Sequence, residues 1–156
     1  LFGEVDEKVK SLPLFGISKK IYKGEIFPPE SDDFVSDDNL FNYQAKIIKE
    51  VAAEESCVII GRCADFILKD NPDVVRLFFY APKEDCIARV KTQNGGTEKE
   101  IIRKIEKTDK YRSDYYRYHT GKDWNDSRNY DFCLNTASMS YEKLVAVVKA
   151  YIEQYK

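Results

Sequence analysis

An arginine directly after a short apolar run is the first feature of this sequence that suggests chemistry. Residues 57–60 form that run, Gly61 ends it, and Arg62 follows at once. A buried strand here would hold the Arg62 guanidinium group at the mouth of a sheet, where it can bind a phosphate or a carboxylate through two hydrogen bonds. The alternative interpretation is a surface arginine paired with Asp65.

The segment from Arg103 to Lys122 is a second candidate, because it is strongly basic. It contains seven lysines and arginines against three acidic residues, whereas the whole chain has a net charge of −2. At helical spacing, four of the basic side chains, including Lys110 and Arg117, fall on one stripe with Asp114 among them. A solvated face with ion pairs is the simplest interpretation of this stripe.

Arg112 projects, on the same helical geometry, from the opposite side, which carries Ile101 and Tyr115. A charged group centred in an apolar face needs a partner when it is buried. We expect that partner to be either a carboxylate, such as Asp109 or Asp131, or a bound anion.

Aromatic residues interleave with the basic ones in this part of the chain: Tyr111, Tyr115, Tyr116, Tyr118 and Trp124. Basic and aromatic residues together occur in single-stranded nucleic-acid sites, in small nucleotide sites and in helices packed on a sheet. The acidic net charge disfavours the first of these, so we expect no nucleic-acid partner.

The cysteine and histidine content argues against a metal site. The four cysteines form no CxxC pair, and His119 is the single histidine, so we expect no metal ligands. Cys57 and Cys133 lie in apolar runs that favour buried strands, which predicts reduced thiols in a cytoplasmic protein. No apolar run approaches the roughly 20 residues of a bilayer span, so we expect no membrane partner.

Predicted strands alternate with predicted helices, which favours a parallel sheet with helices on both faces. Buried strands are expected at residues 57–60, 74–80 and 130–135. Helices are expected at 37–52 (capped by Asp37 or Asp38), from just after Arg62 through Leu68, at 82–90, at 97–118 and after Ser140. Ligands of such sheets bind beyond the carboxyl ends of the strands, here beside Gly61-Arg62, Ala81-Pro82 and Asn135-Thr136.

Three stretches of the sequence, 56–68, 74–90 and 107–136, carry a family resemblance, together with the closing helix after Ser140. The third has Lys-Thr-Asp, Tyr-Tyr, Thr-Gly-Lys, Trp and Asn-Tyr-Asp in that order. From residue 37 to 155 the chain resembles the cytidylate kinase-like family, a branch of the P-loop nucleoside-monophosphate kinases. Its Gly-Arg pair is similar to the Gly-Arg-Asp of cytidylate kinases, with Cys63 in place of the aspartate.

The resemblance implies an α/β, three-layer P-loop kinase fold with a parallel sheet flanked by helices. It implies a single nucleotide-kinase-like domain over residues 1–156. The parts of that domain would be an irregular acceptor-side segment (1–36), a core (37–96), a lid-like basic helical segment (97–129), and a core strand with a closing helix (130–156).

The resemblance also implies a reaction: transfer of the γ-phosphoryl group of ATP, with Mg²⁺, to a nucleoside monophosphate, most simply CMP or dCMP. Arg62 would hold the acceptor phosphate, and Asp131 would help to bind the acceptor nucleotide. Lys110, Arg112 and Arg117 would neutralise charge on the phosphoryl group during transfer. Two alternatives stay open: a kinase of the same fold for another small metabolite, and a non-catalytic nucleotide-binding or regulatory homologue.

The glycine-rich phosphate loop of that family has no counterpart in this sequence. Residues 1–56 contain no glycine cluster, and Asn94-Gly95-Gly96 has neither a preceding strand nor a following Gly-Lys-Ser/Thr. We expect the N-terminal strand, loop and helix to precede Leu1, or the chain to be a homologue that lacks them. The residues that would hold the cofactor are therefore unassigned.

Overall fold

The computed structural model describes residues 23–32 and 36–155, so most of the segment expected to be irregular lies outside the described residues. Internal contacts group the chain into two compact units. The first contains residues up to 71 together with 111–125, and the second contains residues 72–110 together with 126–156. Helix α4 (Glu98–Thr120) supplies residues to both units.

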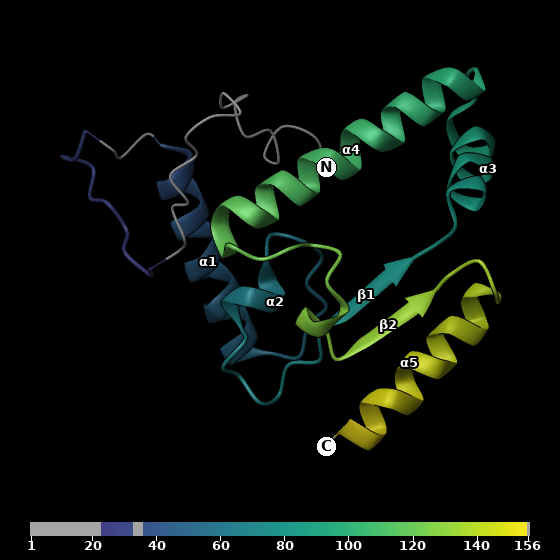
Figure 1. Cartoon of the computed structure of the whole chain (residues 1–156). Coiled ribbons are helices and arrows are strands. Elements are labelled where there is room, and N and C mark those ends of the chain that lie inside the picture. Colours follow the sequence, from purple (N-terminus) through teal and green to yellow (C-terminus); the bar gives the residue numbers. More distant parts are fainter. Residues whose placement is uncertain (1–22, 33–35, 156) are drawn as a thin grey trace. The chain divides into compact units, whose positions relative to one another are not determined.

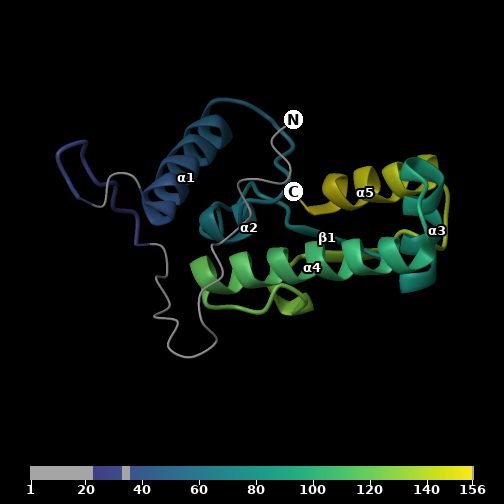
Figure 2. The ribbon, with the colours of Figure 1, turned by 90° about the horizontal axis from the view of Figure 1, so that it is seen from above.

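Helices α1 (Asp37–Glu54) and α2 (Ala64–Ile67) lie side by side in the first unit (Figures 1 and 2). Ser36 caps α1, because its Oγ accepts a hydrogen bond from the backbone N of Asn39 at 3.1 Å. The expectation that Asp37 or Asp38 is the cap is therefore wrong. Both carboxylates lie in the first turn, where negative charge stabilises the positive end of the helix dipole.

The core of the first unit forms where α1 meets the C-terminal end of α4. Phe41 is 2% exposed and stacks on His119 with the ring centroids 3.8 Å apart. The Tyr118 hydroxyl donates a hydrogen bond to Asp38 Oδ1 at 2.9 Å. These contacts anchor the last two turns of α4 to α1.

The second unit contains a sheet of two parallel strands, β1 (Leu77–Tyr80) and β2 (Phe132–Asn135), which lie side by side in Figure 1. Leu77 pairs with Phe132 and Tyr80 pairs with Asn135. Parallel strands need a long crossover connection. Here the chain between them forms α3 (Lys83–Asn94), α4 and the short 3₁₀ helix η1 (Ser127–Asn129), and α5 (Tyr141–Tyr155) follows β2.

Hydrogen bonds fasten the strand pair at both ends. At the amino ends, the side chain of Asp131 accepts hydrogen bonds from Arg76. At the carboxyl ends, the backbone N of Thr136 donates to the carbonyl oxygen of Tyr80 at 2.8 Å. The Tyr151 hydroxyl of α5 donates to the carbonyl oxygen of Asp131 at 3.0 Å, which ties α5 to the start of β2.

The strand expected at residues 57–60 does not form. This segment has no strand assignment, and Val58 and Ile60 are 91% and 89% exposed. A strand is stabilised by its ladder of hydrogen bonds and by the residues that cover it, and apolar composition alone supplies neither. Within the described residues the sheet is limited to β1 and β2, so the expected sheet of three strands is reduced to two.

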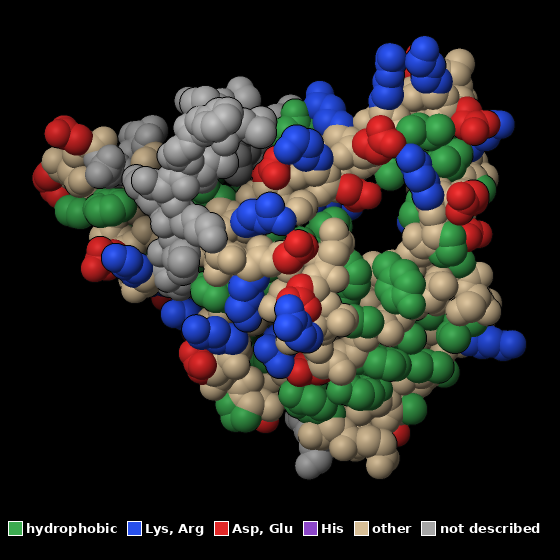
Figure 3. Space-filling view, in the orientation of Figure 1, with side chains coloured by type: hydrophobic (Ala, Val, Ile, Leu, Met, Phe, Trp, Pro, Cys, Tyr) green, Lys and Arg blue, Asp and Glu red, His purple; other side chains and the backbone are tan. Residues whose placement is uncertain are grey.

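The expected burial of β1 is also wrong in part. The strand is shorter than 74–80, and Phe79 and Tyr80 are 51% and 49% exposed. Figure 3 shows hydrophobic side chains gathered over the strands and α5, where Tyr141 is 67% exposed. Because no third strand or second helical layer covers this face within the described residues, its apolar side chains stay accessible.

The cysteines are all free, as expected, but their burial differs from the prediction. Cys57 is exposed because residues 57–60 lie outside the sheet, and Cys133 is half-buried. The thiol of Cys63 is the one that is buried.

The long helix expected from Thr97 is confirmed as α4. Its start is a capping box: Thr97 N and Oγ1 donate to Glu100 Oε2 at 3.0 and 2.7 Å. Gly95, with φ of 65°, ends α3 just before it. No helix among residues 23–32 and 36–155 is long and apolar enough to cross a membrane.

Candidate functional site

Arg62 belongs to the first unit and lies in a turn whose backbone is left-handed. Gly61, Arg62 and Cys63 have φ angles of 73°, 56° and 55°. Side chains with a Cβ rarely adopt this conformation, which costs roughly 1–3 kcal/mol for each non-glycine residue and persists only where the surroundings enforce it. Two such residues in succession mark the Arg62 turn as a strained position, and strained positions cluster at functional sites.

Asp65 lies three residues after Arg62 but does not form the ion pair considered above. Within the described residues its carboxylate is bound by the Tyr116 hydroxyl, which donates to Oδ2 at 2.6 Å. Arg62 is half-buried, and its Nη1 atom is buried.

Burial raises the pKa of Asp65, and three other influences oppose that shift. The largest of these is the hydrogen bond from Tyr116, and the others are local backbone hydrogen bonds and the charge of Lys122. The Lys122 ammonium group also lies 5.8 Å from the centre of the Phe66 ring. The carboxylate is therefore flanked by groups that favour its ionised form.

Arg112 and Arg117 belong to the part of α4 that lies in the first unit. Arg112 is exposed, so the expectation of a charge buried in an apolar face is wrong. The reason is that α4 buries only its ends: no residue between Ile101 and Tyr115 is buried. Arg117 is exposed as well, and its Nη2 lies 3.3 Å from Asp123 Oδ2.

Lys110 and Asp131 belong to the second unit. Lys110 is exposed on α4. Asp131 is mostly buried, and the hydrogen bond from Arg76 is the largest cause that holds its pKa below the usual value. The structure therefore groups Arg62, Arg112 and Arg117 in one unit, and assigns the two remaining candidates to the other.

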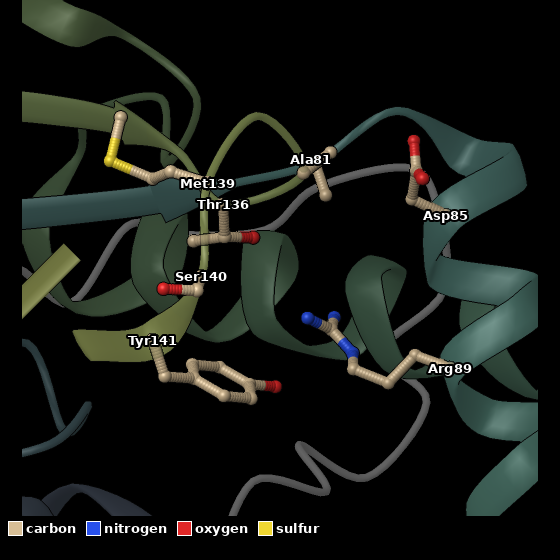
Figure 4. A pocket seen from close by; sticks show the side chains of 8 residues that line it. Ala81, Asp85, Arg89, Thr136, Met139, Ser140 and Tyr141 are labelled. Atoms are coloured by element: carbon tan, nitrogen blue, oxygen red, sulfur yellow. The ribbon is translucent and has the colours of Figure 1, made fainter. Parts of the chain in front are cut away.

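A cavity of about 300 Å³ lies beyond the carboxyl ends of β1 and β2. This is where ligands of parallel sheets were expected, and Ala81 and Thr136 line it. Arg89 of α3 and Tyr141 of α5 point toward one another across it (Figure 4). A guanidinium plane and a phenol ring can both stack on a flat heterocycle.

The sequence interpretation did not include Arg89. The spacing of Arg89 from Asp85 could have indicated it. Arg89 lies four residues after Asp85, and both side chains line the cavity. Residues one turn apart share a helix face, so a helix that begins just after a strand presents them toward the end of that strand.

The described residues contain no group of three or more His, Cys, Asp or Glu that could hold a metal ion. His119 packs among aromatic rings instead, with Phe41 stacked on it and Tyr115 and Tyr118 edge-on to it.

The chain is an α/β protein, because its parallel strands are joined through helices. Its cavity lies at the carboxyl ends of the strands, which is where proteins of this class bind ligands. The chain belongs to the cytidylate kinase-like family, whose model matches residues 2–138. The expected family resemblance is thus confirmed.

Curated relatives include cytidylate kinases. The one from Pyrococcus horikoshii is 34% identical over 104 residues, which are 67% of this chain and 53% of that protein. The one from Methanopyrus kandleri is 27% identical over 86% of this chain and 80% of that protein.

A uronate isomerase from Corynebacterium glutamicum is 30% identical over 67% of this chain, which corresponds to 20% of that protein. The chain thus spans a fifth to about half of the length of several curated relatives. Among solved structures, an uncharacterized protein from Eubacterium ventriosum matches with a TM-score of 0.71 and 32% identity, over 78% of this chain and 77% of that one.

Proposed function

We propose that this chain is part of a phosphotransferase that moves the γ-phosphoryl group of ATP to a nucleoside monophosphate, with CMP or dCMP as the first candidates. The observation that carries the proposal is the strained Gly61-Arg62-Cys63 turn in a chain of the cytidylate kinase-like family. A fixed arginine is suited to a phosphate because its guanidinium group donates two parallel hydrogen bonds. The P-loop kinase fold, the single domain and a cytoplasmic location belong to the same proposal.

In this proposal Arg62 holds the acceptor phosphate and Asp131 helps to bind the acceptor nucleotide. Arg112 and Arg117, together with Lys110, neutralise charge on the transferred group. Phosphoryl transfer needs positioning and positive charge around a dispersed negative charge, and little covalent chemistry from the protein. The exposure of these three basic side chains leaves them accessible to a ligand.

The cavity at the carboxyl ends of β1 and β2 is assigned to a nucleotide base, with Arg89 and Tyr141 as its stacking surfaces. ATP would supply the phosphoryl group, and Mg²⁺ would neutralise its phosphates. Mg²⁺ is commonly held through substrate phosphates and one or two carboxylates, and the proposal gives it no specific protein ligand.

The alternative of another small-metabolite acceptor is favoured by Cys63, because this residue stands where cytidylate kinases have an aspartate. Its thiol is 3% exposed, so it cannot replace a carboxylate that faces a ligand. A non-catalytic nucleotide-binding or regulatory role is the second alternative.

An acceptor panel tests the proposal. The protein expressed from its complete coding sequence is incubated with ATP, Mg²⁺ and, in turn, CMP, dCMP, UMP, AMP and GMP, and the nucleoside diphosphates formed are quantified by chromatography. We expect CDP or dCDP to form fastest. Turnover of another acceptor without CMP or dCMP would favour the first alternative, and nucleotide binding without any turnover would favour the second.

A further inference from the structure

A hydrogen bond joins α4, which carries Arg112 and Arg117, to α2, which begins two residues after Arg62. Tyr116 of α4 donates it to Asp65 of α2 over 2.6 Å. Asp65 follows Arg62 by three residues, and Tyr116 lies directly before Arg117 and four residues after Arg112. The bond therefore links the phosphate-binding turn to the basic end of the helix.

Further contacts hold Tyr116 and the backbone directly before Asp65. Tyr116 is 4% exposed, and its carbonyl oxygen accepts a hydrogen bond from Thr120 Oγ1 at 2.6 Å. On the other side, the backbone N of Ala64 donates to the carbonyl oxygen of Gly61 at 3.1 Å. Because a single turn of backbone connects Asp65 to the strained residues 61–63, a movement of Asp65 would also move those residues.

We propose that Asp65 is a positioning residue: through Tyr116 it fixes the left-handed turn that presents Arg62 beside the arginine-bearing end of α4. A strained turn persists only where its surroundings hold it, and this partly buried hydrogen bond supplies such a constraint. The proposal has two consequences. The structural one, a turn held closed at residues 61–63, does not depend on the proposed function. The other, tighter binding of a phosphate-bearing nucleotide, rests on the proposed function.

Thiol labelling tests the structural consequence without any ligand. Cys63 is in the turn and is 3% exposed, so its reaction rate with a thiol reagent reports opening of the turn. Tyr116→Phe and the milder Asp65→Asn should each speed its labelling by about tenfold or more, the size expected when a hydrogen bond to a charged group is lost. Peptide mass spectrometry separates Cys63 from the exposed Cys57.

Tyr115→Phe is the matched control. It removes a neighbouring hydroxyl on the same turn of α4, which donates to Gln44 Oε1 at 3.3 Å, and it should leave the labelling of Cys63 unchanged. Thermal melts establish that each variant is folded. Unchanged labelling in the folded Tyr116→Phe variant, or equal acceleration in Tyr115→Phe, would overturn the positioning role.

Ligand titration tests the binding consequence. Tyr116→Phe should weaken CMP by about tenfold and leave cytidine unchanged, and adding Asp65→Asn should weaken CMP no further, because the two changes break the same bond. Additive losses would contradict the proposal. A wild-type chain that binds neither compound would refute the proposed function, while the Cys63 rates would still decide the positioning role.

Discussion

Arg76 binds Asp131 through both its side chain and its backbone. The guanidinium Nη2 and Nε donate to Oδ1 and Oδ2 at 2.6 and 2.9 Å, and the backbone N of Arg76 donates to Oδ2 at 2.8 Å. These residues precede β1 and β2 directly, so one carboxylate holds the amino ends of both strands together. Any role of Asp131 toward a nucleotide comes in addition to this structural one.

Replacement of Asp131 by Asn should therefore destabilise the chain. The charge-assisted hydrogen bonds are lost while Arg76 stays in place, and we expect a decrease of about 2 kcal/mol in the free energy of unfolding. Chemical denaturation measures this. The control is Glu106→Gln, which removes the exposed ion pair with Lys83 and should cost about 1 kcal/mol or less. Equal costs for the two variants would contradict the structural role.

His119 should make the stability depend on pH. Burial lowers the pKa of His119 from 6.5 to about 4, so between these values the unfolded chain binds a proton that the folded chain does not. Stability is then complete above pH 6.5 and falls as the pH drops toward 4, by about 3 kcal/mol. Unfolding free energies measured at several pH values test this.

The matched variant is His119→Phe, which keeps a flat ring against Phe41 and cannot titrate. The difference in stability between wild type and variant isolates the contribution of His119 from every other pH-dependent contribution. The charge of Asp38 opposes the downward shift in the pKa of His119. The difference should change between pH 6.5 and pH 4. A constant difference would contradict the assignment.

Arg112→Leu separates a ligand-binding arginine from a structural one. Because Arg112 is exposed, its replacement should change the free energy of unfolding by no more than about 0.5 kcal/mol. Phosphate-bearing nucleotides should bind more weakly to this variant. A loss of about 3–5 kcal/mol would instead indicate that a buried ion pair had been broken.

Local signals predicted much of the fold. Helix α4 begins where it was expected, next to Thr97, and the apolar and aromatic runs identified both strands of the sheet. Residues 57–60 were misjudged because an apolar run does not show whether a neighbouring strand covers it. Arg112 was misjudged because a helical projection assumes one continuous buried stripe, whereas α4 buries only its ends.

Local sequence patterns could not predict which residues bind the side chains of the candidate site. Tyr116 and Asp65 are 51 residues apart, and Arg76 and Asp131 are 55 residues apart. Tertiary packing decides which of many carboxylates each donor reaches. The left-handed conformation of Arg62 and Cys63 was equally hidden, because neither residue type favours it.

The most direct test of the central claim compares CMP with cytidine on wild type and on Arg62→Gly. Glycine adopts positive φ without strain, so this variant removes the guanidinium group and keeps the turn, with stability unchanged or higher. Calorimetric titration should show that wild type binds CMP more tightly than cytidine, and that the variant loses about tenfold or more of this preference. A folded Arg62→Gly variant that keeps the full preference for CMP would contradict the account.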